Sequence, residues 1–203
     1  MIKNIFKIAL GLVVVSSTLL SYEIKMESIG FAGGNAKTPL VQHNKDNKEI
    51  VIDKLDDNFK TMELYTVLKP IEEIGMNPYL SYTYSYNEQF INYYVMAGLN
   101  KYYKISSSSK LYLGVLGGYG QMKWEFDPIN GSDNDVSTQS YILGVQGGVS
   151  IPLENLPSDK LSLDINVKYL SHEYITNLKT SATTSQIEHY ETMLAQVGIS
   201  YRF

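Results

Sequence analysis

The end of the chain carries its clearest pattern, an alternation of apolar and polar residues with a period of two. From Thr192 to Phe203 every second side chain is apolar, and the residues between are polar or glycine except for Leu194. The apolar residues are Met193, Ala195, Val197, Ile199, Tyr201 and Phe203. This is the period of a β-strand with one apolar face and one polar face. The pattern therefore predicts an all-β protein.

Seven segments further upstream alternate with a similar period. The expected strands cover residues 22–34, 61–68, 78–86, 90–103, 110–125, 136–151, 160–174 and 187–203. The phase of the first segment is ambiguous beyond Ser28, because Ile29 and Phe31 have the opposite parity from Met26. Eight strands is an even number, as expected for an antiparallel sheet that closes on itself.

The amino terminus has the layout of a secretory signal peptide. Lys3 and Lys7 are followed by an apolar run, residues 8–15, and by small residues up to Ser21. The run is much shorter than the ~20 residues that a transmembrane helix needs, so a membrane anchor is the weaker interpretation. We expect residues 1–21 to be a cleaved signal peptide and residues 22–203 to form one domain. Removal of the two lysines would change the formal net charge from −4 to −6.

The composition limits the remaining classes. The chain has 203 residues, which allows one domain, and it contains 17 tyrosines but no cysteine. An exported chain without disulfides needs another source of stability, and a closed hydrogen-bonded barrel supplies it. The acidic balance argues against nucleic acid as a partner.

The last strand resembles the closing strand of bacterial outer-membrane β-barrels. Their assembly signal is a polar residue, a glycine two positions later, and two alternating aromatic or apolar residues, the last of them terminal. Gln196, Gly198, Tyr201 and Phe203 occupy these places. The chain as a whole is similar to the small barrels typified by the OmpA membrane domain, OmpX and the opacity-type surface proteins. This similarity lies in pattern rather than residue identity.

The resemblance implies an eight-stranded antiparallel transmembrane β-barrel in the outer membrane, with short periplasmic turns and longer outer loops. With both termini in the periplasm, the outer connections are residues 35–60, 87–89, 127–135 and 177–185. The periplasmic turns are residues 69–77, 105–109 and 152–159. The implied partners are outer-membrane lipid, lipopolysaccharide and the barrel-assembly machinery, which would engage the C-terminal strand. The sequence does not identify a surface or host ligand.

The polar faces of the expected strands carry charges of both signs. An eight-stranded barrel is filled by its own side chains, so these charges would lie close together. We expect them to pair, because an unpaired buried charge is strongly destabilising. The expected lumen residues are Lys25, Glu27, Glu63, Asp164, Lys168 and Arg202. In the alternative, a soluble β-sandwich or lipocalin-like barrel, the same residues would face water.

The histidines give little sign of a metal site. The three histidines are His43, His172 and His189, and no pair has the close spacing typical of zinc ligands. His172 and His189 belong to two strands that are expected to pair. They are read either as a shared site or as two separate histidines at the barrel rim. We expect no metal and no cofactor.

A catalytic role is also not expected. Ser171-His172-Glu173 resembles in part the catalytic segment of outer-membrane lipid A deacylases, in which a serine follows the histidine by two positions. Tyr174 occupies that position here, and Ser171 precedes the histidine. Adjacent strand residues point to opposite faces, so this serine and histidine are not expected to reach each other.

Three functions remain as hypotheses. The first is a non-enzymatic outer-membrane protein with an envelope-structural or surface-interaction role, carried by its external loops. The second is a narrow pore for small solutes, which measurable conductance would distinguish from the first. The third is a lipid-modifying enzyme, for which the sequence offers no catalytic pair.

Overall fold

The structure is a computed structural model that describes residues 25–44, 57–106, 108–124, 137–153, 160–179 and 184–203. These residues form nine strands. They are β1 (Met26–Lys37), β2 (Leu40–Asn44), β3 (Asn58–Leu68), β4 (Asn77–Tyr86), β5 (Phe90–Lys104), β6 (Lys110–Trp124), β7 (Ser137–Pro152), β8 (Leu161–Lys179) and β9 (Thr184–Arg202). Within these ranges there is no helix with the length and apolar character needed to cross a bilayer.

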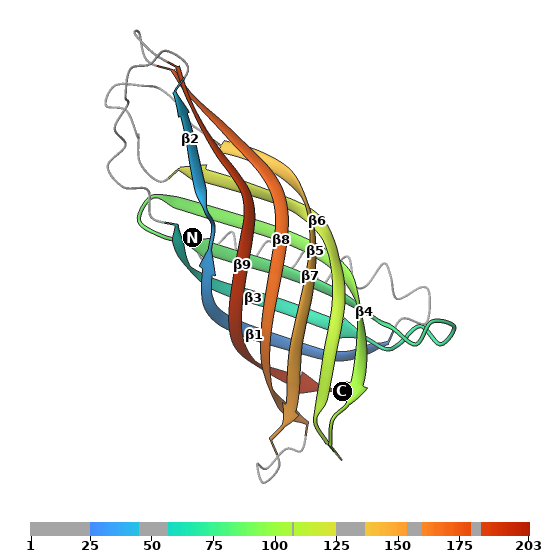
Figure 1. Cartoon of the computed structure of the whole chain (residues 1–203). Coiled ribbons are helices and arrows are strands. Elements are labelled where there is room, and N and C mark those ends of the chain that lie inside the picture. Colours follow the sequence, from blue (N-terminus) through green and yellow to red (C-terminus); the bar gives the residue numbers. More distant parts are fainter. Residues whose placement is uncertain (1–24, 45–56, 107, 125–136, 154–159, 180–183) are drawn as a thin grey trace.

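The strands form one closed antiparallel barrel (Figure 1). Neighbours in sequence pair from β3 to β9, and β1 pairs with both β3 and β9, which closes the sheet. β2 pairs with β9 beyond the end of β1, from Leu40 opposite His189 to Asn44 opposite Ser185. Thr38 and Pro39 separate β1 from β2, and Pro39 has no N–H to donate to the ladder. β1 and β2 thus act as one interrupted strand, and the predicted eight-stranded barrel is confirmed.

The ambiguous phase in the first segment results from a local irregularity in β1. Met26 pairs with Leu68 and Ser28 pairs with Val67, so the register between β1 and β3 shifts between Met26 and Ser28. Beyond this shift, Ile29 and Phe31 are exposed on the outside while Ser28 is buried inside. A bulge of this kind changes which parity faces inward, and it explains why a strict alternation fails here.

The outside of the barrel is apolar around its middle. Tyr141, Leu143 and Val145 are 83%, 71% and 54% exposed on β7 alone. Exposed aromatic residues border this band at both ends: Tyr119, Tyr141 and Tyr169 at one, and Tyr103, Tyr201 and Phe203 at the other. From Tyr141 to Ile151, about ten residues at a tilt of about 40° rise by ~25 Å. That height matches the apolar band of a transmembrane barrel.

The two longest strands, β8 and β9, have 19 residues each and extend past the other strands together with β2 (Figure 1). Residues 177–185 were expected to be a loop, but the described residues of this range, 177–179 and 184–185, extend the strand pairing, with Asn177 opposite Gln186 and Lys179 opposite Thr184. Thr184 is β-branched, which suits an extended ladder. Likewise, β2 and the start of β3 lie within the expected loop of residues 35–60.

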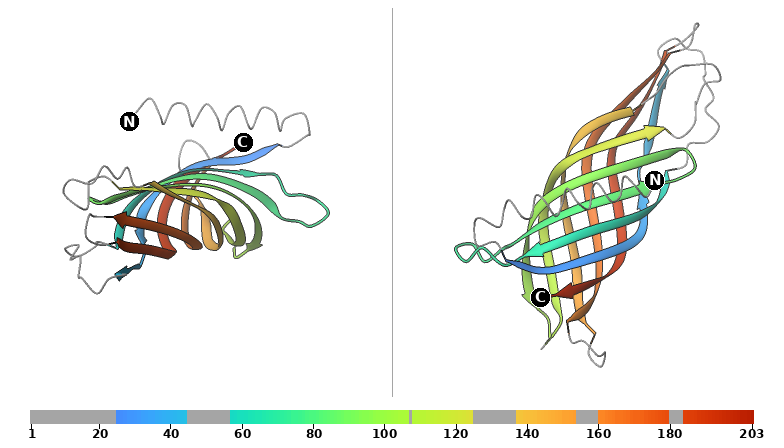
Figure 2. Two further views of the ribbon diagram at one scale, coloured as in Figure 1. Left: turned by 90° about the horizontal axis from the view of Figure 1, so that it is seen from above. Right: turned by 180° about the vertical axis from the view of Figure 1, so that it is seen from behind.

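The connections agree with one orientation of the barrel. At the end of the barrel where β1 begins and β9 ends, β3, β5 and β7 also end and β4, β6 and β8 begin (Figures 1 and 2). The extended β2–β9–β8 ribbon lies at the opposite end. The expected signal peptide, residues 1–21, and the expected loop of residues 127–135 are outside the described residues.

Candidate functional site

A polar network crosses the lumen in the half of the barrel where β1 begins and β9 ends. Glu63 on β3 and Lys168 on β8 form an ion pair, and both side chains are fully buried. The Tyr79 hydroxyl donates to Glu63 Oε1 at 2.8 Å, and Lys168 Nζ donates to the Tyr79 hydroxyl at 2.8 Å. β1 and β9 separate the two walls that this pair joins. The network therefore ties together strands that do not pair directly.

Two further contacts fill the lumen beside this pair. The Tyr65 hydroxyl donates to Asp164 Oδ2 at 2.5 Å, and the Tyr65 ring stacks on Tyr79 with centroids 5.9 Å apart. Gln146 Nε2 donates to Asn100 Oδ1 at 2.6 Å. The bond from Tyr65 to Asp164 is charge-assisted, and bonds of this kind offset part of the cost of burying a carboxylate.

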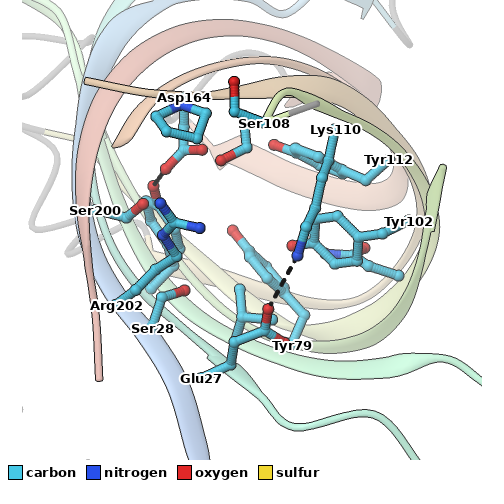
Figure 3. A pocket seen from close by; sticks show the side chains of 15 residues that line it. Glu27, Ser28, Tyr79, Tyr102, Ser108, Lys110, Tyr112, Asp164, Ser200 and Arg202 are labelled. Carbon is cyan, nitrogen blue, oxygen red and sulfur yellow. Dashed lines mark hydrogen bonds and ion pairs between the residues drawn. The ribbon is translucent and has the colours of Figure 1, made fainter. Parts of the chain in front are cut away.

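At the end of the barrel where β1 begins and β9 ends, the lumen opens into a small polar vestibule (Figure 3). Lys110 Nζ lies 3.4 Å from Glu27 Oε1, and Asn77 Nδ2 donates to Glu27 Oε2 at 2.6 Å. Arg202 and Asp164 line the opposite side. The cavity measures about 30 Å³, which holds only one or two water molecules. The vestibule is thus a small recess whose lining includes Tyr79, the hydrogen-bonding partner of the buried Glu63–Lys168 ion pair.

Aromatic and histidine side chains fill the other half of the lumen. Phe90 contacts Trp124 and His189, with ring centroids 4.2 Å and 5.6 Å apart. His172 Nε2 lies 2.8 Å from Thr192 Oγ1, within hydrogen-bonding distance. His172 is 5% exposed and His189 is fully buried. The two histidines therefore lie together inside the barrel, packed among aromatic rings.

The structure brings together only part of the predicted charge network. Glu63, Asp164 and Lys168 lie inside the lumen, and Glu27 and Arg202 line its vestibule. Lys25 lies elsewhere: it precedes β1, is exposed, and lines a hollow on the outer surface. The bulge in β1 accounts for this difference, since parity counted from Glu27 does not apply across the shift.

Several residues of the network were not among the expected lumen residues. They are Tyr65, Tyr79, Asn77, Asn100, Lys110 and Gln146. Tyr65 shares its parity with Glu63, and Tyr79 shares its parity with Ser81, so strand parity alone could have placed both tyrosines inside. Other tyrosines, such as Tyr103 and Tyr119, lie exposed on the outside of the barrel.

The four residues of the expected assembly signal lie at the seam where β9 meets β1. Gln196 is buried inside, whereas Tyr201 and Phe203 are exposed outside. Gly198 lies opposite Ala32, and a Cβ atom on it would come within 2.5 Å of the Phe31 carbonyl oxygen. Glycine at this position therefore permits the close approach of the two closing strands.

The geometry also bears on catalysis and metal binding. Ser171 is exposed on the outer face of β8, while His172 is buried on the inner face, so the two side chains diverge. Among the described residues, no three His, Cys, Asp or Glu side chains form a group that could hold a metal ion.

A closed eight-stranded barrel with an apolar outer band, aromatic borders and a filled polar lumen defines a small bacterial outer-membrane β-barrel protein. The sequence model of the autotransporter beta-domain family matches residues 77–203, which is more than half of the chain. The chain therefore belongs to the autotransporter beta-domain family.

Solved structures support the fold. Neisserial surface protein A aligns with a TM-score of 0.56 and 16% sequence identity, over 87% of this chain and 96% of that one. The outer membrane protein OprG from Pseudomonas aeruginosa aligns with a TM-score of 0.52 and 10% identity, over 88% of this chain and 98% of that one. At these identities the likeness concerns the fold alone. Comparison with curated protein sequences gave no match.

Proposed function

We propose that this protein is a non-enzymatic, non-conducting barrel of the outer membrane that acts at the cell surface through its β2–β9–β8 extension. The observation that carries the proposal is the buried Glu63–Lys168–Tyr79 network, which occupies the lumen between the vestibule and the aromatic half. Solute flow would require this ion pair to separate inside a low-dielectric interior, which is strongly unfavourable. A surface role is then the function that the remaining features support.

The extension supplies a surface for that role. β8 and β9 continue beyond Tyr169 and the outer aromatic border, and β2 adds a third strand. Tyr190 and Glu173 are exposed on the outside of this ribbon. Elements that project from a rigid scaffold commonly carry the interactions of such proteins. The molecule that binds here is a surface or host ligand.

The proposal includes the route to the membrane. Residues 1–21 act as a signal peptide, and the barrel-assembly machinery engages the last strand through Gln196, Gly198, Tyr201 and Phe203. Outer-membrane lipid and lipopolysaccharide then surround the barrel. Amino-terminal sequencing of the protein from outer membranes should begin at Tyr22. A first residue within the segment of residues 1–21 would contradict this cleavage site.

Conductance tests the lumen. The purified barrel should show altered gel mobility after boiling in detergent, which identifies the folded state, and should give no channels in a planar bilayer. Discrete channels from the folded protein would instead favour the narrow pore. A protein that stays soluble in the periplasm and shows no mobility change would contradict the membrane barrel itself.

Cysteine labelling tests the orientation, because the chain has no cysteine of its own. Tyr190→Cys should react with a membrane-impermeant maleimide on intact cells. The matched variant Lys104→Cys, at the other end of the barrel, should react only after the outer membrane is permeabilised. The reverse result would place the extension in the periplasm and remove its surface role.

A further inference from the structure

The connection between β3 and β4 forms a hydrogen-bonded turn that projects from the barrel wall (Figures 1 and 2). Ile71 pairs with Met76, and the Ile71 N–H donates to the Met76 carbonyl at 2.8 Å. Gly75 closes the turn with a φ of 58°, a conformation that glycine adopts without strain. Lys101 of β5 donates to the Gly75 carbonyl at 3.0 Å. The turn is therefore held against the barrel in a defined position.

A hollow of about 410 Å³ lies between this turn and the outer wall. Its apolar lining comes from the end of β3, the turn, β4 and β5: Leu68, Pro70, Ile71, Pro78, Leu80 and Ala97. The rest of the lining is Lys25, Lys69, Tyr79 and Gly98, so among the described residues it contains no carboxylate. This volume falls in the range of about 300–1,000 Å³ that is typical of small-molecule pockets.

The hollow spans two depths of the membrane. Lys25 and Lys69 lie at the end of the barrel marked by the exposed Tyr103, where lipid headgroups are expected. Leu80 and Ala97 pair across β4 and β5 and lie further along the strands, on the apolar band. The site therefore offers cations at headgroup depth and apolar surface at the depth of hydrocarbon.

The tip of the turn is itself amphipathic. Ile71 and Ile74 are 39% and 48% exposed, while Glu72 and Glu73 are exposed beside them and outside the lining of the hollow. Exposed apolar side chains next to a bilayer are stabilised when they enter the interface between headgroups and acyl chains. The tip thus favours contact with the periplasmic leaflet over contact with water.

We propose that this hollow binds one anionic phospholipid of the periplasmic leaflet. An acyl chain packs against Leu80 and Ala97, and the phosphate lies between the Lys25 and Lys69 ammonium groups. The charge of the lining selects this occupant, because two exposed lysines without a carboxylate partner in the lining favour an anionic headgroup. The inference rests on the membrane placement proposed above.

Native mass spectrometry of the purified, heat-modifiable barrel tests the site, with phosphatidylglycerol and phosphatidylcholine added separately in mild detergent. The wild type should retain one phosphatidylglycerol and bind phosphatidylcholine more weakly. The double variant Lys25→Gln, Lys69→Gln should lower the affinity for phosphatidylglycerol by about 25-fold, because each lysine near an anionic group contributes roughly fivefold. Ala97→Phe should fill the hollow and abolish retention.

Two matched variants control for non-specific effects. Lys104→Gln removes an exposed lysine at the same end of the barrel that does not line the hollow. Val145→Phe enlarges an exposed side chain on β7, also outside the hollow. Both should bind as the wild type does. Equal retention of the two lipids, or unchanged binding in both test variants, would overturn the site while leaving the barrel intact. A protein without heat-dependent mobility would overturn the membrane placement and the site together.

Discussion

The Lys168 ammonium donates a hydrogen bond to the Glu63 carboxylate inside the barrel, and neither side chain is exposed to solvent. The Lys168 ammonium also lies 5.0 Å from the centre of the Tyr79 ring. A buried pair of this kind contributes little net stability over a well-packed apolar pair, but the loss of one partner leaves an unpaired charge. The pair therefore makes single and double substitutions behave differently.

Lys168→Met should destabilise the barrel by about 3–5 kcal/mol, because it leaves the Glu63 carboxylate buried without its cation. The double variant Glu63→Leu, Lys168→Met should be more stable than this single variant. Urea unfolding in lipid vesicles measures both free energies. Lys110→Met, which breaks the partly exposed pair with Glu27, should cost about 1 kcal/mol or less. Equal costs for Lys168→Met and Lys110→Met would contradict the burial of the pair.

The sequence predicts most of the sheet because lipid-facing strands alternate with a strict period of two. The expected and observed bounds of β4, β5, β6 and β7 differ by one residue at most. Larger differences occur at the outer end, where β1, β3, β8 and β9 continue beyond their expected bounds and β2 was not expected. There the outer face no longer needs apolar residues, so the alternation that identifies a strand disappears while the hydrogen-bonded ladder continues.

The lumen is less predictable, because its pairs join residues that are far apart in sequence. Strand parity places Glu63 and Lys168 on inner faces, but only the closed barrel brings these residues, 105 positions apart, into contact. The inward tyrosines, such as Tyr65 and Tyr79, differ from the lipid-facing ones by parity alone. For Lys25, strand parity gave the wrong prediction, because a one-residue shift in β1 separates this residue from the lumen.

Gly198→Ala should reduce the fraction of folded barrel at the β1–β9 seam. The added Cβ would lie 2.5 Å from the Phe31 carbonyl oxygen and 2.7 Å from Ala32 Cβ, so the two closing strands would have to separate. Gly33→Ala is the matched control on the same seam, because its Cβ would meet only the Thr61 carbonyl oxygen at 3.7 Å. Heat-dependent gel mobility after refolding measures the folded fraction. Equal folding of the two variants would show that the seam does not require glycine at position 198.

Val145→Arg tests the depth of the apolar band. Val145 is exposed on the outside near the middle of β7, and an arginine near the bilayer midplane costs ~2–4 kcal/mol. Gln139→Arg lies on the same face near the outer aromatic border and should cost ~0–1 kcal/mol. Unfolding free energies in vesicles give the comparison. Equal costs at both positions would place the band's centre elsewhere or remove the barrel from the bilayer.

Deletion of Phe203 should lower the amount of protein in the outer membrane while export across the inner membrane stays normal. The Phe203 N–H donates to the Glu27 carbonyl at 3.0 Å, and its exposed ring packs edge-on against Tyr201 with centroids 5.5 Å apart. The deletion removes the last hydrogen bond beside the β1–β9 ladder and the aromatic end of the expected assembly signal. Phe203→Asp should have a similar effect, because a carboxylate is unfavourable at this lipid-facing position. Phe203→Tyr keeps the aromatic ring and should insert as the wild type does.

Quantitative blotting of outer-membrane fractions measures the effect of these Phe203 variants in cells. Spontaneous refolding into vesicles is the parallel assay, and together the two assays separate recognition by the assembly machinery from the stability of the barrel. A defect in cells but not in vesicles assigns the residue to recognition by the assembly machinery, whereas an unchanged membrane yield of the deletion variant would contradict the role of the terminal aromatic residue.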